Sequence, residues 1–419
     1  MAEPQNFSSG GRAVFTYPSY VRYLSARLCV VMALEMQSVA VGWRVYEITR
    51  SPLALGLTGL AQFLPGILLF LVSGHVADRW DRRRLALFCY LGFTFCSAAL
   101  LATEVRGLQS ANPIYAVLLL LGVARAFSGP ATRALMPQIV SPPHFPSAVA
   151  WDASAFQMAT ILGPSAGGVL YAIFGGPSAL YGIAAAGHAA AMFFMLRVRV
   201  RKAPGPRDPL SLATALAGLR YIWRQKVVLG SISLDLFAVL LGGAVALLPV
   251  YAREILSTGP WGLGLLRSAP GIGAATMAFV LAHRPVRRKA GAIMLGCVAG
   301  FGVCTIVFAF SRSLPMSLLA LVLVGATDMV SVVVRGTLVQ VTTPDEMRGR
   351  VNAVELMFIG ASNQLGQFES GLTAQWFGTV PAVALGGVGA LAVTALWAWR
   401  FPELRRADLP SAETRELGS

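Results

Sequence analysis

The segment GHVADRWDRRR, residues 74–84, is short and charged and lies between two long apolar runs. A chain that leaves an apolar layer, exposes this many charges and soon enters the layer again forms a tight hairpin at a membrane face. A weaker second copy follows later in the chain. Pro65-Gly66 and Arg82-Arg83-Arg84 recur 205 residues later as Pro270-Gly271 and Arg287-Arg288-Lys289. The recurrence predicts a membrane protein that arose by duplication.

The composition is that of a chain that crosses a membrane many times. Of its 419 residues, 56% are hydrophobic and 13% are charged, with a mean hydropathy of +0.65, whereas a soluble domain carries about 25% charged residues. A helix needs about 20 apolar residues to span a bilayer, and on this basis we predict an all-α membrane protein with twelve transmembrane helices. Their ranges are 23–45, 53–75, 85–104, 112–133, 148–175, 178–197, 228–252, 261–282, 291–311, 315–336, 351–378 and 381–400.

The net charge of +15 is better explained by membrane topology than by nucleic-acid binding. If the N-terminus is cytoplasmic, most of the 34 Lys and Arg residues fall in cytoplasmic segments, as the positive-inside rule requires. The basic residues on the other face are Arg44, Arg50, Arg106, Arg253 and Arg312. We therefore expect a multi-pass protein of the inner cell membrane, with both termini in the cytoplasm and no nucleic-acid partner.

Cysteine spacing and catalytic motifs give no sign of a cofactor. The five cysteines lie inside apolar runs without metal-ligand spacing, so we interpret them as small buried hydrophobic residues. Gly163-Pro164-Ser165-Ala166-Gly167 matches the G-x-S-x-G pattern of hydrolases, but that pattern needs a strand before it and a helix after it. Close helix packing through small residues is the better interpretation. We expect no metal, no cofactor and no enzymatic activity, and a packed role for the isolated His188.

One long polar segment divides the chain. Residues 198–227 contain the breaker cluster RKAPGPRDP at 201–209. In the following segment, 210–226, the apolar spacing and basic end predict an amphipathic helix on the membrane surface. The predicted parts are an N-terminal six-helix bundle, a cytoplasmic linker, a C-terminal six-helix bundle and a cytoplasmic tail, at 1–197, 198–227, 228–400 and 401–419.

The two halves match along their length. With an offset of 203 residues, the matched pairs are Gly122 with Gly325, Asp152 with Glu355, Gly163 with Gly366, Gly168 with Gly371 and Gly175 with Gly378. Gln138 and Pro142 match Gln340 and Pro344 one residue out of step. This ordered set predicts two parallel six-helix bundles related by a pseudo-twofold axis along the membrane normal, with a site between them near the midplane.

Four motifs in the sequence resemble those of a known superfamily. They are Gly74-x-x-x-Asp78-Arg79-x-x-Arg82-Arg83 in the first hairpin, Ala26-Arg27 in the first run, Gly163-Pro164-x-x-Gly167-Gly168 in the fifth, and TPDEMRGRVN at 343–352 before the eleventh. Over nearly the whole chain the sequence resembles the major facilitator superfamily, and within it the branch of enterobactin exporters and drug-efflux proteins. One departure from the superfamily pattern is Asp81, where glycine is usual.

The resemblance implies a conformational latch in the first hairpin. Gly74 would allow close helix approach. Asp78 would dock on a helix N-terminus, which favours a carboxylate, or on an arginine of the other half, and so close the cytoplasmic side. Arg133, which ends the run 112–133, is the candidate partner. Arg79, Arg82 and Arg83 would belong to the same latch, although the positive-inside rule alone also explains their charge.

Four charged residues lie deep inside apolar runs, where they are costly unless they face a cavity or a partner: Glu35, Arg125, Asp235 and Asp328. They occupy the first, fourth, seventh and tenth runs, and the resemblance implies that these runs line a central cavity. The repeat gives Arg125 and Asp328 matched positions and opposite signs. This predicts either a pair between the two halves that opens and closes, or a permanent ion pair.

Proton coupling is predicted through Glu35 or Asp235, because a carboxylate inside a membrane cavity can take up and release a proton during transport. Glu369 is a weaker candidate for the same role. Asp152 and Glu355 are expected to cap helices or to pair with loop arginines rather than to bind substrate.

The predicted function is secondary active export of small amphipathic molecules by alternating access, as in multidrug efflux, driven by proton antiport. The direction of transport follows from the resemblance alone. Arg27, Arg125 and Arg267 would suit an anionic catecholate siderophore, whereas the acidic residues named above would suit a lipophilic cation. Siderophore export is therefore the alternative, and a non-transporting membrane sensor or scaffold is the second alternative. The expected partners are the substrate, protons and the lipid bilayer, and the expected state is a monomer.

Overall fold

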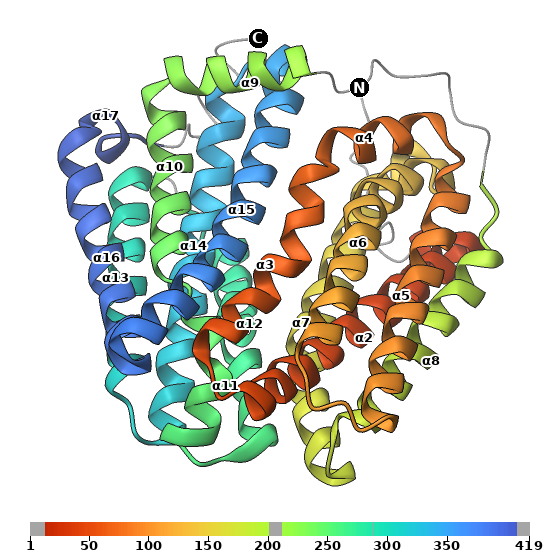
Figure 1. Ribbon diagram of the computed structural model, residues 1–419. Coiled ribbons are helices and arrows are strands. Elements are labelled where there is room, and N and C mark those ends of the chain that lie inside the picture. The colour runs from red at the N-terminus through yellow and green to blue at the C-terminus, as the bar shows by residue number, and fades with distance from the viewer. Residues whose placement is uncertain (1–12, 201–211, 287, 409–419) are drawn as a thin grey trace. The chain divides into compact units, whose positions relative to one another are not determined.

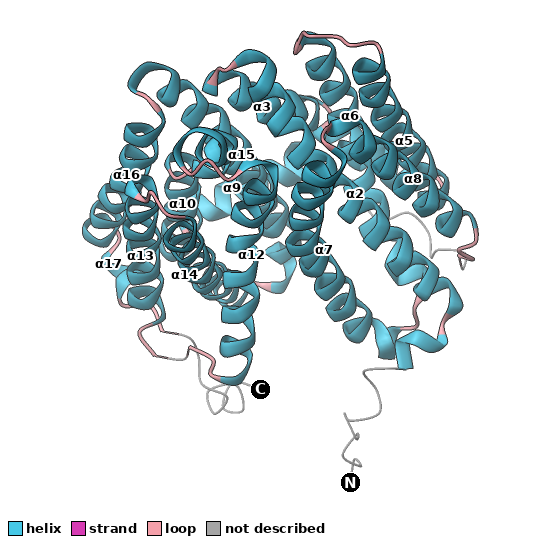
Figure 2. Ribbon diagram, turned by 90° about the horizontal axis from the view of Figure 1, so that it is seen from below, coloured by secondary structure: helices cyan, strands magenta, loops and turns pink. Residues whose placement is uncertain are grey.

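The computed structural model describes residues 13–200, 212–286 and 288–408, and every regular element in these ranges is helical (Figure 1; Figure 2). The predicted all-α class is therefore confirmed. The chain divides into two compact units. The first comprises residues 1–49 and 61–210, and the second comprises residues 50–60 and 211–419.

The first unit is built from long helices joined by short connections. Its elements are η1 (Ala13–Thr16), α2 (Pro18–Thr49), α4 (Phe70–Arg79), α5 (Arg82–Val105), α6 (Asn112–Ile139), η2 (Pro142–His144), α7 (Phe145–Phe174) and α8 (Pro177–Leu196). Helix α3 (Pro52–Leu68) begins among residues that group with the second unit and ends in the first. Leu69 separates α3 from α4, so the predicted run 53–75 is two helices rather than one.

The second unit has more interruptions. Its elements are α9 (Leu212–Arg224), α10 (Lys226–Leu241), η3 (Ala244–Leu247), α11 (Leu248–Val250), the π-helical η4 (Tyr251–Ile255), α12 (Gly259–His283), α13 (Ala290–Phe310), α14 (Leu314–Thr342), α15 (Asp345–Phe377), α16 (Thr379–Arg400) and α17 (Pro402–Arg405). The predicted run 228–252 is an uninterrupted α-helix only as far as Leu241. Beyond that residue it continues in short 3₁₀, α and π turns.

Ten helical stretches among the described residues are long and apolar enough to cross a membrane. Two predicted runs are not among them. One is 53–75, which is interrupted at Leu69, and the other is 351–378, whose helix α15 is long but rich in polar residues. With these two included, the helices match the twelve predicted spans.

Small residues let helices of the first unit pack closely. A Cβ added at Gly163 would lie 2.6 Å from the Cβ of Glu35, and one added at Gly167 would lie 3.0 Å from the Cα of Met36. Helix α7 therefore packs on α2 as the small-residue pattern predicts. The G-x-S-x-G match lies in the middle of α7, without a preceding strand. His188 is fully buried, as expected.

The repeat is visible in one contact that each unit contains. In the first unit, a Cβ at Gly122 would lie 3.1 Å from Pro65 Cγ. In the second unit, a Cβ at Gly325 would overlap the backbone of Pro270. Because both the glycines and the prolines are repeat mates, the duplicated pattern encodes one helix pair twice, as α6 on α3 and as α14 on α12.

Helix α10 ends in the middle of its predicted span, where the sequence is Gly242-Gly243. Ala244 donates its backbone N–H to the carbonyl oxygen of Gly242 at 2.7 Å, and so does not make the helical bond to Leu240. A Cβ at Gly243 would overlap the carbonyl group of Gly366, so the interruption brings α10 and α15 into backbone contact. Irregular backbone at membrane depth is tolerated where it is buried in protein or lines a cavity.

Helix α9 runs across the ends of α10 and α15 (Figure 1). Tyr221 donates its hydroxyl to Thr342 O at 2.8 Å, and Gly218 packs against the backbone of Arg350. Trp223, by contrast, is 67% exposed. The amphipathic helix of the linker is therefore a packed part of the second unit. The predicted breaker cluster before it lies outside the described residues.

Candidate functional site

The charged hairpin joins α4 to α5, and two of its arginines bind backbone carbonyl groups of other helices in the first unit. Arg83 Nε donates to Met195 O at 3.2 Å and its Nη2 donates to Leu196 O, at the C-terminus of α8. Arg82 Nη1 donates to Ala134 O of α6 at 3.2 Å. A cation at a helix C-terminus interacts favourably with the macrodipole. Both arginines therefore hold the hairpin against its own unit.

The other residues of the predicted latch have few defined contacts. The side chain of Asp78 lies outside the described residues, and Arg79 and Arg133 are exposed. A Cβ at Gly74 would meet no described atom within 4 Å. A latch formed by Asp78 and Arg133 remains a prediction.

The conformation of Asp81 accommodates the departure from the superfamily pattern at this position. Asp81 is the N-cap of α5, with φ −60° and ψ 112°, and its Oδ1 accepts a hydrogen bond from the backbone N–H of Arg84 at 2.8 Å. Glycine is needed where φ is positive, whereas this backbone is ordinary for any L residue. The aspartate supplies a side-chain cap that glycine lacks.

The first unit contains an ion pair between two helices. Arg27 Nε of α2 lies 2.8 Å from Asp152 Oδ1 of α7, and both side chains are largely buried. The guanidinium group also lies over the ring of Phe156, at 5.7 Å from its centroid. Asp152 thus pairs with an arginine, as expected, but with one in a helix rather than in a loop. The pair is neutral overall, which weakens the case for Arg27 as an anion-binding residue.

The second unit contains a buried ion cluster around Arg335, which the sequence prediction missed. This residue of α14 is 2% exposed, and it pairs with Asp235 of α10 and with Glu355 of α15, the latter at 3.1 Å. The repeat contains a signal for it. Arg335 follows Arg133 by 202 residues. The same offset relates Gln138 to Gln340 and Pro142 to Pro344.

A cavity of about 260 Å³ lies within the second unit and contains Asp328 in its lining. Asn363 and Gln367 of α15, aromatic rings from α13 and the interrupted backbone after α10 line it as well. A smaller recess shares Asp328 with the cavity and has Asp235 of the ion cluster in its lining as well. A carboxylate, two carboxamides and aromatic faces can together bind an amphipathic molecule through polar and apolar contacts.

Glu35 and Arg125, the predicted cavity charges of the first unit, have different surroundings. Arg125 is exposed on α6 and donates from Nη1 to Gln62 Oε1 at 3.0 Å. Glu35 is half-buried on α2, where its Cβ faces Gly163. The predicted pairing of Arg125 with Asp328 would join residues of different units and remains a prediction.

Comparison with known proteins supports the same architecture. A family model described as transmembrane secretion effector matches residues 21–416. The enterobactin exporter EntS of Citrobacter koseri is 26% identical over 404 residues, covering 94% of each chain. EntS of Salmonella typhimurium is 27% identical over 402 residues, covering 93% of this chain and 94% of the relative.

Solved transporter structures share the fold at lower identity. A bacterial homologue of the human lysosomal transporter Spinster, inward-facing and occupied, has a TM-score of 0.73 at 13% identity, covering 94% of this chain and 99% of its own. The D-xylose–proton symporter has a TM-score of 0.69 at 15% identity, covering 94% of this chain and all of its own. The chain therefore belongs to the transmembrane secretion effector family of the major facilitator superfamily, and it is a multi-pass membrane transporter rather than an enzyme.

Proposed function

We propose that this transporter exports small amphipathic molecules by proton antiport, and that Asp328 and its cavity form the part of the site that binds substrate and protons. The observation that carries the proposal is the composition of this cavity, whose lining combines one carboxylate with two carboxamides and aromatic rings. Cavities of this kind bind the apolar body of a ligand through the rings and orient its polar group through the few polar side chains.

The balance of charge in the second unit supports proton exchange at this place. Asp235 and Glu355 share one guanidinium group, that of Arg335, and Asp328 interacts electrostatically with the same arginine and with Asp235. Three carboxylates beside one arginine leave excess negative charge, which is costly inside a membrane. Binding a proton or a cationic substrate at Asp328 would relieve that cost, and the two would compete for the carboxylate. Competition of this kind is the basis of antiport.

The proposal includes the direction of transport and the orientation of the chain in the membrane. Export is supported by the similarity to the EntS enterobactin exporters, and alternating access by the two-unit plan. The excess of basic residues on one face supports a cytoplasmic location of both termini, by the positive-inside rule, with the chain in the inner membrane of the cell.

The test is efflux from vesicles that contain the purified chain and carry an imposed pH gradient. A lipophilic cation dye is followed for wild type, Asp328→Asn and Glu346→Gln, where Glu346 is an exposed carboxylate at the start of α15. Asp328→Asn should lower proton-driven dye efflux by about tenfold or more, as expected when an essential proton acceptor is lost. Glu346→Gln should leave it unchanged. Full efflux by Asp328→Asn would refute the role of this carboxylate.

Siderophore export is the second candidate, and Arg125 favours it. The partner of Arg125 is the neutral carboxamide of Gln62, so the pair keeps a full positive charge that an anionic catecholate would match. The same vesicles are tested with a catecholate siderophore. Efflux that survives Asp328→Asn and falls in Arg125→Gln would establish this alternative. If the chain moves neither compound under the pH gradient, the result would favour the remaining alternative, a non-transporting sensor or scaffold.

A further inference from the structure

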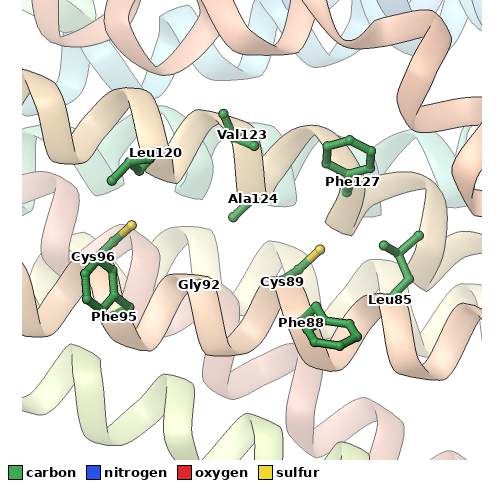
Figure 3. Close-up of a pocket in the computed structure, with 10 residues that line it drawn as sticks. All are labelled: Leu85, Phe88, Cys89, Gly92, Phe95, Cys96, Leu120, Val123, Ala124 and Phe127. Carbon is green, nitrogen blue, oxygen red and sulfur yellow. The ribbon is translucent and has the colours of Figure 1, made fainter.

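An apolar groove of about 330 Å³ runs between α5 and α6 of the first unit. Figure 3 shows its two walls facing each other along the helices, with Leu85 and Phe127 at one end and Cys96 and Leu120 at the other. The groove is open in its middle because Gly92 has no side chain and faces Ala124, whose Cβ would lie 3.4 Å from a Cβ on the glycine. Small residues thus form its floor and large ones form its rims.

The rims are turned away from the core of the unit. Phe88 is 64% exposed, Phe95 is 63% exposed and Leu120 is 53% exposed, although all three lie inside predicted spans. Phe88 and Phe95 belong to α5, the third run, which is not among the runs expected to line a central cavity, so these exposed apolar side chains face lipid. The groove therefore opens towards the hydrocarbon of the bilayer.

One end of the groove is positively charged. Arg84 directly precedes Leu85 and is exposed. Arg82, one turn away, reaches across from α5 to the backbone of Ala134 on α6. The nearest carboxylate in sequence is Asp81, which is engaged as the N-cap of α5. An apolar groove with two arginines in the helical turn at its end is complementary to a lipid with an acyl chain and an anionic headgroup.

The length of the groove matches one leaflet of a bilayer. From Leu85 to Cys96, α5 rises by about 16 Å at 1.5 Å per residue. Half of a hydrocarbon core of about 30 Å is about 15 Å. An acyl chain lying along the groove would therefore reach from the headgroup level at Arg84 to the bilayer midplane.

We propose that this groove binds one acyl chain of an anionic phospholipid in the leaflet on the arginine-rich side, with the lipid phosphate held by Arg84 and Arg82. The positive-inside rule makes this the cytoplasmic leaflet. Binding does not involve the Asp328 cavity, which belongs to the other unit. A lipid held here would reinforce the contact of α5 with α6 next to the charged hairpin.

The test measures retention of phosphatidylglycerol by the full chain in native mass spectrometry, with phosphatidylcholine as the zwitterionic reference. Arg84→Gln removes a headgroup contact, and its matched control is Arg106→Gln, at the other end of the same helix. Val123→Trp fills the groove from its open side, and its matched control is Leu119→Trp, exposed on α6 but not part of the groove. Thermal stability in detergent without added lipid shows that each variant is folded.

The expected result is that Arg84→Gln raises the apparent Kd for phosphatidylglycerol about fivefold and that Val123→Trp causes a comparable loss. Both control variants should bind as wild type does, and phosphatidylcholine should bind more weakly than phosphatidylglycerol throughout. Equal retention of the two lipids by wild type would overturn the charge recognition. Unchanged retention by a folded Val123→Trp would overturn the groove as the place of binding.

Discussion

The first membrane-spanning helix of each unit packs against a glycine that the repeat matches, Gly163 or Gly366, but the two contacts are built differently. In the first unit, α2 is continuous and Glu35 packs on Gly163. In the second unit, α10 stops after Leu241, and Gly243 packs on Gly366, the repeat mate of Gly163. One unit keeps a regular helix and places a carboxylate at the contact. The other gives up the helix there, and the irregular backbone becomes part of the wall of the Asp328 cavity.

The same two helices differ in the sign of the charge that each carries in its third turn. In its third turn, α2 carries Arg27, which pairs with Asp152, whereas α10 carries Asp235 in its own third turn. Glu355, the repeat mate of Asp152, pairs with an arginine of a different helix, Arg335 of α14. A duplicated framework can therefore keep a carboxylate in place while its partner moves to another helix. The cost is that one arginine in the second unit serves two carboxylates.

The largest expected effect comes from removing that arginine. Arg335→Met leaves Asp235 and Glu355 buried without their cation, and breaking a buried ion pair in this way typically costs about 3–5 kcal/mol. Arg27→Met should cost less, because its pair is single and more exposed. Thermal unfolding in mild detergent, together with the yield of folded protein, should rank Arg335→Met well below Arg27→Met.

A charge-neutral variant separates lost charge balance from lost packing. Arg335→Met combined with Asp235→Asn and Glu355→Gln should recover most of the stability, because the two carboxylates that form ion pairs with Arg335 are then neutral as well. If the triple variant is as unstable as Arg335→Met alone, the cluster acts through the shape of its side chains. If Arg27→Met and Arg335→Met lose equally little stability, the two units do not differ in how strongly they depend on their buried arginine.

The second effect concerns the interruption after α10. Gly243→Ala places a methyl group against the backbone of Gly366, and overpacking of this kind typically costs about 1–3 kcal/mol. Gly296→Ala in α13 is the control, because a Cβ there meets no described atom within 4 Å. The control should be neutral or stabilising by about 0.5–1 kcal/mol, since alanine is the better helix former. A Gly243→Ala protein as stable as wild type would mean that α10 and α15 do not need to touch.

Hydropathy and the repeat predicted the helices and their close contacts well, because both depend on local patterns. Twelve apolar runs and the paired glycines Gly122 and Gly325 can be recognised without knowing which helices meet. Arg335 was missed because an arginine near the end of an apolar run is what membrane topology alone would produce. The interruption at Gly242-Gly243 was missed because two glycines lower the mean hydropathy of their run too little to divide it, and the stretch Lys226–Ile255 still contains an 18-residue window with a mean hydropathy of 2.1. Both features depend on neighbours that only the fold brings together.

The smallest effect compares the hairpin before α5 with the one before α13. Asp81 caps α5 with its side chain, whereas the N-cap of α13 is Lys289, with φ 52° and no side-chain cap. Asp81→Ala should lower stability by about 1 kcal/mol. Lys289→Gly should be nearly neutral, because relief of the left-handed backbone, about 1 kcal/mol, is offset by the greater chain entropy that glycine loses, about 0.5–1 kcal/mol. Denaturant unfolding in detergent should therefore show a larger loss of stability for Asp81→Ala than for Lys289→Gly. A larger loss from Lys289→Gly than from Asp81→Ala would show that the lysine side chain, and not its backbone, stabilises the second hairpin.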